Sequence, residues 1–235
     1  MKTLICNPWW GLWNSNGING SQRMSYLFHE KLYRSSPAMK KLTKMPVTIC
    51  GAGALGANIA ESLARSGVSQ LTVIDCDRLD ERNLSTQPYY RDDVGAKKVT
   101  LLEHHLYEAV GVEINSVAKK LLPDNASRLL KDSGLVIDAF DNSEARQAVT
   151  DACWVLQIPC LHAGLSPDFS EVLWNEQYRV PSDVNDDICD YPLARNLVML
   201  TVAIATEIAI RYITTGEKEN RMVTFQDFSV TALAP

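Results

Sequence analysis

The sequence predicts an α/β protein built on one doubly wound, mainly parallel sheet with helices on both faces. From Pro46 onward, short runs rich in β-branched residues alternate with segments of helical period, as in parallel strands joined by helical crossovers. The first of these runs leads directly into the glycine-rich turn G-A-G-A-L-G and then into an amphipathic segment. A strand, a tight glycine turn and a helix in that order are typical of the start of such a sheet.

Strands and helices are expected to follow one another in regular order. The clearest strands are expected at 47–50, 71–75, 112–117, 135–138 and 159–163, with weaker signals at 171–174 and 222–225. Helices are expected at 55–66, 97–110, 124–132, 142–156 and about 191–213. This alternation favours a sheet that is covered by helices on both faces.

The length and composition allow one full core and an added arm. At 235 residues, of which 46% are apolar, the chain is predicted to form one domain over residues 46–235. Residues 1–45 have no clean period and hold three of the five tryptophans, so they are interpreted as an N-terminal arm. Residues 167–192 contain three prolines and an acidic cluster and are predicted to form a mobile crossover loop.

Charge and cysteine usage argue against several classes of protein. The net charge of −5 gives no sign of a general affinity for nucleic acid or an anionic membrane. The six cysteines are widely spaced, which favours reduced thiols and a cytoplasmic setting. The apolar run 193–213 includes polar and charged residues, which favour a buried or interface helix over a membrane span. These residues are Arg195, Asn196, Glu207 and Arg211.

The glycine turn predicts a nucleotide site in a Rossmann-like sheet. At a junction of strand and helix, backbone amides and the helix N-terminus can face phosphates. Asp75 follows Gly56 by 19 residues, at the end of the next expected strand, where its carboxylate can accept hydrogen bonds from ribose hydroxyls. The alternative is tight glycine packing without a ligand. The residues of the turn are Gly51, Gly53, Ala54, Leu55 and Gly56.

The turn by itself leaves a dinucleotide and ATP open, and the residues that follow decide between them. Residues 73–88 read V-I-D-C-D-R-L-D-E-R-N-L-S-T-Q-P, residues 94–99 read V-G-A-K-K-V, and residues 136–142 read V-I-D-A-F-D-N. This order resembles the ThiF/MoeB/HesA, ubiquitin-activating-enzyme-like adenylyltransferases, whose pattern is D-x-D, N-L-x-R-Q, V-G-x-x-K and D-x-x-D-N. The resemblance implies ATP and Mg²⁺ as cofactors.

The resemblance also implies roles for individual side chains. Lys98 would supply a cation to the phosphates, and Asp141, beside Asn142, would hold Mg²⁺ through oxygen, the ligand that a hard cation prefers. Asn83 would orient the phosphates or the ribose, and Gln87 would orient the loop. Each has an ordinary alternative: Lys98 as a solvated surface lysine, and Asp141 or Asn142 as a helix N-cap.

The sequence departs from the family pattern at one arginine position and in its cysteines. Where the pattern has an arginine, this chain has Thr86, so Arg82 would have to reach the phosphates instead. The resemblance also implies an arginine inserted by the partner of a dimer from its N-terminal region, for which Arg23 is the candidate. Asp77, the second acid of the D-x-D motif, is interpreted as a nucleotide contact or as support for the turn. Many members of the family also carry a structural zinc on two C-x-x-C pairs; this chain has no such pair, which predicts no structural zinc.

One thiol and the histidines complete the candidate groups. Cys189 resembles the family's catalytic cysteine, where a thiolate could attack an acyl adenylate to give a thioester or an acyl persulfide. Its alternative is a plain loop thiol. None of the four histidines is assigned a role.

The expected function is therefore ATP-dependent activation of a carboxylate as acyl-AMP, in the first place the C-terminal glycine of a ubiquitin-like or sulfur-carrier protein. Adenylation of a peptide or tRNA-linked carboxylate is the nearest alternative. An NAD(P)-dependent oxidoreductase would share the glycine turn and Asp75, and a non-catalytic partner subunit would explain Thr86. The long apolar helix near 191–213 predicts a homodimer.

Overall fold

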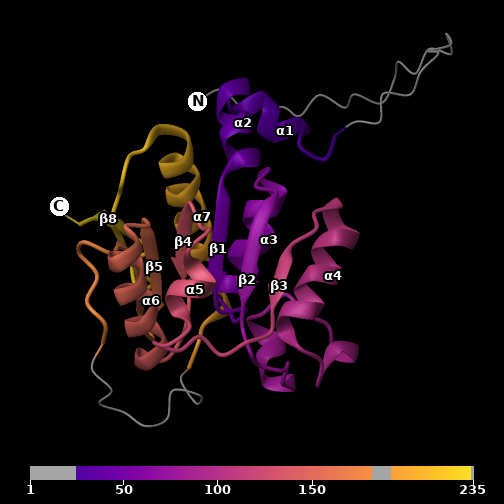
Figure 1. Ribbon diagram of the computed structural model, residues 1–235, viewed down its shortest axis with the longest axis vertical. Coiled ribbons are helices and arrows are strands. Elements are labelled where there is room, and N and C mark those ends of the chain that lie inside the picture. The colour runs from indigo at the N-terminus through magenta and orange to yellow at the C-terminus, as the bar shows by residue number, and fades with distance from the viewer. Residues whose placement is uncertain (1–24, 182–191, 234–235) are drawn as a thin grey trace, which may run out of the picture.

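The computed structural model describes residues 25–181 and 192–233, which form one sheet with helices on both faces (Figure 1). The strand order is β3-β2-β1-β4-β5-β6-β7-β8. Neighbouring strands from β3 to β5 are parallel, and those from β5 to β8 are antiparallel. The strands are β1 (Pro46–Cys50), β2 (Gln70–Ile74), β3 (Asn115–Val117), β4 (Leu135–Asp138), β5 (Cys160–Leu165), β6 (Phe169–Trp174), β7 (Arg221–Thr224) and β8 (Val230–Ala232). The predicted doubly wound α/β fold is confirmed.

Helices on the two faces of the sheet enclose two core layers. The layer that includes Ile49 is built with α2 (Ser36–Lys44), α3 (Gly56–Arg65), α4 (Lys98–Val110) and α7 (Arg195–Thr215). The layer that includes Cys50 is built with α5 (Ala126–Leu130) and α6 (Ser143–Leu156). Ile49 and Cys50 belong to different layers because successive side chains of a strand point to opposite faces.

The boundaries differ from the sequence-based expectation in a few places. Of the strand expected at 112–117, only residues 115–117 form β3. Val112 and Ile114 lie in the connection that follows α4, and their apolar side chains are buried in the core without belonging to the strand. β8 was not expected, since its three residues are all exposed and show no alternation. α7 ends at Thr215, where Gly216 adopts the left-handed conformation (φ 84°) that terminates many helices.

The expected N-terminal arm is partly helical and belongs to the main core. Of residues 1–45, the structure describes 25–45, which contain α1 (Phe28–Tyr33) and α2. Met39 and Leu42 of α2 are buried in the first core layer, so the expected boundary at residue 46 does not separate two units. Residues 1–24, with the three tryptophans and Arg23, lie outside the described residues.

The crossover loop expected at 167–192 is shorter than predicted at its start. Residues 169–174 form β6, which pairs with both β5 and β7. The remainder, 182–191 with Cys189, lies outside the described residues.

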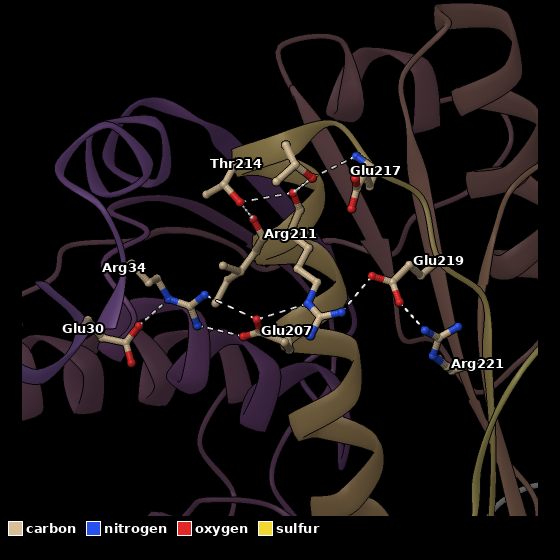
Figure 2. Close-up of polar contacts among 10 residues, drawn as sticks. Glu30, Arg34, Glu207, Arg211, Thr214, Glu217, Glu219 and Arg221 are labelled. Carbon is tan, nitrogen blue, oxygen red and sulfur yellow. Dashed lines mark hydrogen bonds and ion pairs between the residues drawn. The ribbon is translucent and has the colours of Figure 1, made fainter. Parts of the chain in front are cut away.

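A chain of ion pairs ties α1 to α7 and to β7 (Figure 2). Arg34, which follows α1 directly, contacts Glu30 at 2.6 Å and Glu207 of α7 at 2.8 Å. Arg211 of α7 continues the chain from Glu207 (3.4 Å) to Glu219 (2.9 Å). Arg221, at the start of β7, also pairs with Glu219. Positive and negative groups alternate along the whole row.

α7 is the central helix of the first layer. Among the described residues it is the one helix whose length and composition would suit a membrane crossing, but more than half of that stretch is buried inside the protein. It packs against α3 and the sheet, with Val202, Ala205 and Ala209 fully covered or nearly so. Its apolar surface is therefore used largely within the fold.

Candidate nucleotide site

The candidate site lies at one edge of the sheet, where three neighbouring parallel strands end. The glycine turn follows β1, Asp75 follows β2, and Asp141 comes shortly after β4. Because β2, β1 and β4 are adjacent and parallel, their carboxyl ends meet at the same edge (Figure 1). The topology thus brings together residues that are far apart in the sequence.

The glycine turn is shaped by close approach of the backbone. Gly51 has φ 100°, and a Cβ there would lie 2.9 Å from the Ala139 carbonyl oxygen. A Cβ on Gly56 would lie 2.0 Å from the Gly51 carbonyl oxygen. Packing alone therefore requires these two glycines. Gly53 differs, because a Cβ there would meet nothing nearer than Gln87 Nε2 at 4.0 Å, so this part of the turn has space beside it.

Asp75 is buried and holds the glycine turn in place. Its Oδ2 accepts a hydrogen bond from the Ala52 amide at 2.6 Å, and its Oδ1 accepts one from the Asp77 amide at 2.7 Å. Burial raises the pKa of Asp75, against the opposing effect of these two amides and of Lys98. The carboxylate that was expected to contact ribose thus also organises the backbone of the turn.

Lys98 begins α4 beside the same segment. Its side chain is 8% exposed, so the alternative of a solvated surface lysine is wrong. The Nζ atom lies 3.5 Å from Oδ2 of Asp77, whose side chain is 60% exposed. A buried ammonium group needs nearby negative charge. Lys98 therefore places a cation next to the glycine turn and Asp75, with one exposed carboxylate as its ion-pair partner among the described residues.

Residues 81–87 form a tight loop over the glycine turn. They contain the 3₁₀ helix η1 (Glu81–Ser85), in which Asn83 Oδ1 accepts from the Asp80 amide at 3.1 Å. The Asn83 carbonyl also accepts from the amides of Thr86 and Gln87. Asn83 thus stabilises the loop through both its side chain and its carbonyl group. Gln87 is buried, and its Oε1 has no hydrogen-bond partner within residues 25–181 and 192–233.

Asn58, which was not singled out from the sequence, joins this loop to the glycine turn. Its Nδ2 donates to the Ala54 carbonyl at 2.7 Å and to the Thr86 carbonyl at 2.9 Å. Asn58 and Thr86 are both buried. The position where the family pattern has an arginine is therefore held to the turn through the side chain of Asn58, which contacts the Thr86 carbonyl.

Arg195 is a second residue that the sequence did not indicate. It lies at the start of α7 and donates from Nη1 to the Ser85 carbonyl at 3.3 Å, across a separation of 110 residues. Arg82, one of the two arginines expected near the phosphates, lies 3.6 Å from Asp80 with both side chains exposed. A cation at the N-terminus of a helix is opposed by the helix dipole, so Arg195 gains nothing from α7 itself.

Asn142, and not Asp141, takes the helix-cap role that was open for both. Asn142 is the N-cap of α6, because its Oδ1 accepts from the Ala145 amide at 2.9 Å. Asp141 is exposed, and its Oδ1 accepts from the Asn142 amide group at 3.4 Å. The carboxylate of Asp141 is therefore not used as the cap. One exposed carboxylate together with substrate phosphates is a common way to hold Mg²⁺, so Asp141 fits that ion.

Asp75, Cys76 and Asp77 also bring three metal-ligating side chains together. Asp75 is engaged with two amides, and Lys98 lies beside Asp77. A neighbouring ammonium group opposes a second cation. This cluster fits nucleotide contacts better than a metal ion.

A buried polar network surrounds Asp138, which lies three residues before Asp141 at the end of β4. His162 Nδ1 lies 2.9 Å from Asp138 Oδ2, and His162 Nε2 lies 2.7 Å from Asn175 Oδ1. Arg146 of α6 donates to the Tyr178 hydroxyl at 2.9 Å and to the Ala163 carbonyl at 3.0 Å, and its Nη1 lies 3.6 Å from Asp138. His162 thus has a structural role, although no histidine was assigned one from the sequence.

Comparison with known proteins gives a consistent family. A model of the ThiF family matches residues 24–174. The sulfur carrier protein ThiS adenylyltransferase of Bacillus subtilis is 34% identical over 127 residues, which cover 52% of this chain and 38% of that protein. The adenylyltransferase and sulfurtransferase MOCS3 of Anopheles gambiae is 36% identical over 121 residues, 51% of this chain and 27% of that protein. The chain spans less than half the length of these relatives.

Solved structures agree on the fold. MccB of E. coli, crystallised with AMPCPP and MccA, has a TM-score of 0.75 at 17% identity, covering 92% of this chain and 72% of that one. PaaA has a TM-score of 0.68 at 22% identity, covering 84% of this chain and 66% of that one. At these identities the likeness shows the shared fold alone.

Proposed function

Because the chain belongs to the ThiF family, we propose that it is an ATP-dependent adenylyltransferase that activates a carboxylate as acyl-AMP. The observation that carries the proposal is Lys98, whose ammonium group is buried at the start of α4 next to the glycine turn. A nicotinamide dinucleotide also carries phosphates, so Lys98 supports a phosphate ligand, and the exposed carboxylate of Asp141, which suits Mg²⁺, favours ATP over NAD. The names of the relatives, which are adenylyltransferases, support the same reaction.

In the proposed reaction, a carboxylate oxygen of the acceptor attacks the α-phosphorus of ATP. A P–O bond forms, the bond to the pyrophosphate leaving group breaks, and acyl-AMP and pyrophosphate result. Two anionic groups must approach each other, so the site has to neutralise charge and align them. Lys98 and the backbone amides near Gly53 supply positive charge, and Asp141 would hold Mg²⁺, which further neutralises the phosphates.

For the acceptor, we propose the C-terminal glycine of a ubiquitin-like or sulfur-carrier protein. The support comes from the relatives, which include a ThiS adenylyltransferase and a SAMP-activating enzyme E1 from Haloferax volcanii. A shorter peptide carboxylate is the second candidate. It is favoured by the fold shared with MccB, whose structure with MccA matches 92% of this chain. Transfer of the acyl group to Cys189 is a further step of the first proposal.

The proposed setting is a cytoplasmic homodimer. The described cysteines Cys50, Cys76, Cys153 and Cys160 are free thiols, in keeping with a reducing compartment. Light scattering of the purified protein tests the dimer, and a monomer at all concentrations would refute it. Replacing Cys189 with alanine tests the thiol step, which predicts that adenylate still forms but no acyl thioester or persulfide accumulates.

Pyrophosphate exchange into ATP tests the central proposal. We expect exchange that depends on a carrier ending in glycine and on Mg²⁺. Lys98→Met should lower the exchange rate by about 100-fold, the scale seen when one charge-stabilising donor is removed. Lys131→Met, at an exposed position that follows α5, is the matched control and should remain within about two-fold, the change typical of an exposed charge.

A binding measurement separates the competing functions. ATP with Mg²⁺ should raise the melting temperature, whereas NAD and NADP should not, because only a ligand that prefers the folded state stabilises it. Stabilisation by NAD without exchange on any carboxylate would favour an oxidoreductase. ATP binding without adenylate formation by the pure chain would favour a non-catalytic partner subunit.

A further inference from the structure

The hydroxyl group of Tyr89 lies between the two backbone segments that form the proposed phosphate site. Its Oη is 3.0 Å from the Ala52 carbonyl oxygen, in the glycine turn, and 3.4 Å from the Lys98 carbonyl oxygen, in the first turn of α4. Tyr89 is 6% exposed, and its ring belongs to the first core layer. A buried phenol therefore bridges the turn and the helix that carries Lys98.

The contact at Ala52 completes a pair of restraints on one residue. The Ala52 amide donates to Asp75, and the Ala52 carbonyl accepts from Tyr89. The backbone of the glycine turn is thus held on both sides of Ala52. Burial, with the charges of Asp75 and Asp93, raises the pKa of Tyr89 far above its usual range, so the hydroxyl keeps its hydrogen as a donor at all ordinary pH values.

ATP has to be contacted by both segments at once. The amides of the glycine turn and the Nζ atom of Lys98 can share the phosphates only at a suitable separation, and displacements of about 1 Å in such sites have large effects on rate. A tyrosine has one hydroxyl hydrogen, which the two carbonyl oxygens compete for. This shared hydrogen bond fixes how far the turn and α4 lie from each other.

We propose that Tyr89 is a positioning residue that sets the separation between the glycine turn and Lys98 and thereby determines the affinity for ATP. The inference rests on the proposed function, because it assigns the ligand as ATP. It concerns the hydroxyl group of Tyr89, while the ring serves the core.

Tyr89→Phe tests the inference, because it keeps the ring and removes the hydroxyl. Loss of one such hydrogen bond should raise the Kd for ATP·Mg²⁺ and the KM for ATP in pyrophosphate exchange by about three- to ten-fold. The KM for the carboxylate acceptor should stay unchanged. Hydrogen exchange of the amides in the glycine turn should become faster, since the Ala52 carbonyl loses its donor.

Two control variants separate positioning from general stability. Tyr90→Phe removes the hydroxyl of the neighbouring tyrosine, which is 68% exposed, and should leave ATP binding unchanged. Thr201→Val removes a fully buried hydroxyl of α7, which bonds to Ser170 far from the site along the chain. It should lower the melting temperature at least as much as Tyr89→Phe, without changing the KM for ATP.

The outcomes are distinguishable. If Tyr89→Phe lowers the melting temperature like Thr201→Val but leaves the Kd for ATP and the exchange of the turn amides unchanged, the inference is overturned and the proposed function stands. If the wild-type chain itself shows no binding of ATP·Mg²⁺, the proposed function fails first. The hydrogen-exchange measurement does not depend on activity, so it tests the positioning role even in a variant that turns over poorly.

Discussion

The imidazole of His162 and the carboxylate of Asp138 form a buried pair, with Nδ1 and Oδ2 2.9 Å apart and neither side chain exposed to solvent. The other ring nitrogen lies 2.7 Å from Asn175 Oδ1, so each ring nitrogen of His162 has an oxygen partner. Asp138 ends β4, three residues before Asp141. The pair thus stabilises the strand end from which the proposed Mg²⁺ ligand projects.

Replacing His162 with alanine should destabilise the protein strongly. The change removes a hydrogen-bonded partner from a buried carboxylate and leaves a cavity beside Tyr178, whose ring stacks on His162 at 3.8 Å. Leaving a buried acceptor without a hydrogen-bond partner typically costs about 1–3 kcal/mol, and more when the acceptor is charged. Urea unfolding measures this cost, and His104→Ala, at a largely exposed position, is the control and should stay within about 0.5 kcal/mol of wild type. A small effect of His162→Ala would contradict the structural role.

The Asp138 pair should also make stability depend on pH. Burial by itself raises the pKa of Asp138, but Arg146 and His162 outweigh it and hold the pKa below its usual range. A depressed carboxyl pKa stabilises the folded state above the ordinary aspartate value of about 3.9, and this stabilisation is lost as the pH falls through the folded-state pKa. The cost of Asp138→Asn should therefore be largest near neutral pH and should shrink below about pH 4. Unfolding curves at several pH values give the comparison, and a constant difference would count against the assignment.

Asp141 and Asn142 should respond oppositely to substitution. Asp141→Asn keeps the helix cap, so the melting temperature should stay near that of wild type while the Mg²⁺ concentration needed for pyrophosphate exchange rises by about ten-fold or more. Asn142→Ala removes the cap of α6 and should cost about 1 kcal/mol of stability. Thermal melts and Mg²⁺ titrations of both variants check this. A large loss of stability in Asp141→Asn would show that the carboxylate supports the fold instead.

Arg195 should matter for the loop at 81–87 more than for α7. Arg195→Ala removes the donor to the Ser85 carbonyl, so the loop amides should exchange faster and the KM for ATP should rise by about two- to five-fold, the size expected for an exposed charged contact. Arg65→Ala, which breaks an exposed ion pair with Glu61, is the control and should leave both quantities unchanged. Equal behaviour of the two variants would remove Arg195 from the site.

Much of the architecture was predictable because its signals are local. β-branched runs mark β1, β2 and β4, and the glycine turn after β1 marks the helix that follows it. Signals at the periphery were weaker. α2 was missed because only Met39 and Leu42 are buried in it, and β8 because its residues are all exposed.

The sequence predicted which residues belong to the candidate site, but it did not predict the contacts that those residues make. The motifs located Asp75, Lys98 and Asp141, and the parallel strands bring them to one edge. The partners that join distant segments carry no local signal: Arg195 and Ser85 are 110 residues apart, and His162 meets Asp138 through the register of β4 and β5. The contacts of Tyr89 could not be predicted either, because its hydroxyl group bonds to the backbone of two separate segments and no sequence pattern marks such contacts.

The alternating row of ion pairs in Figure 2 links the stability of the two ends of the described chain. Arg34 directly follows the first described helix and Arg221 belongs to a strand near the other end, yet Glu207 and Arg211 connect them through α7. A break at any inner member disrupts two neighbouring pairs, so partial opening at one end loosens the other. Both ends are therefore expected to unfold as one cooperative unit, and salt should weaken the pairs of the half-exposed Arg211 more than the Arg34–Glu207 pair, in which Arg34 is mostly buried.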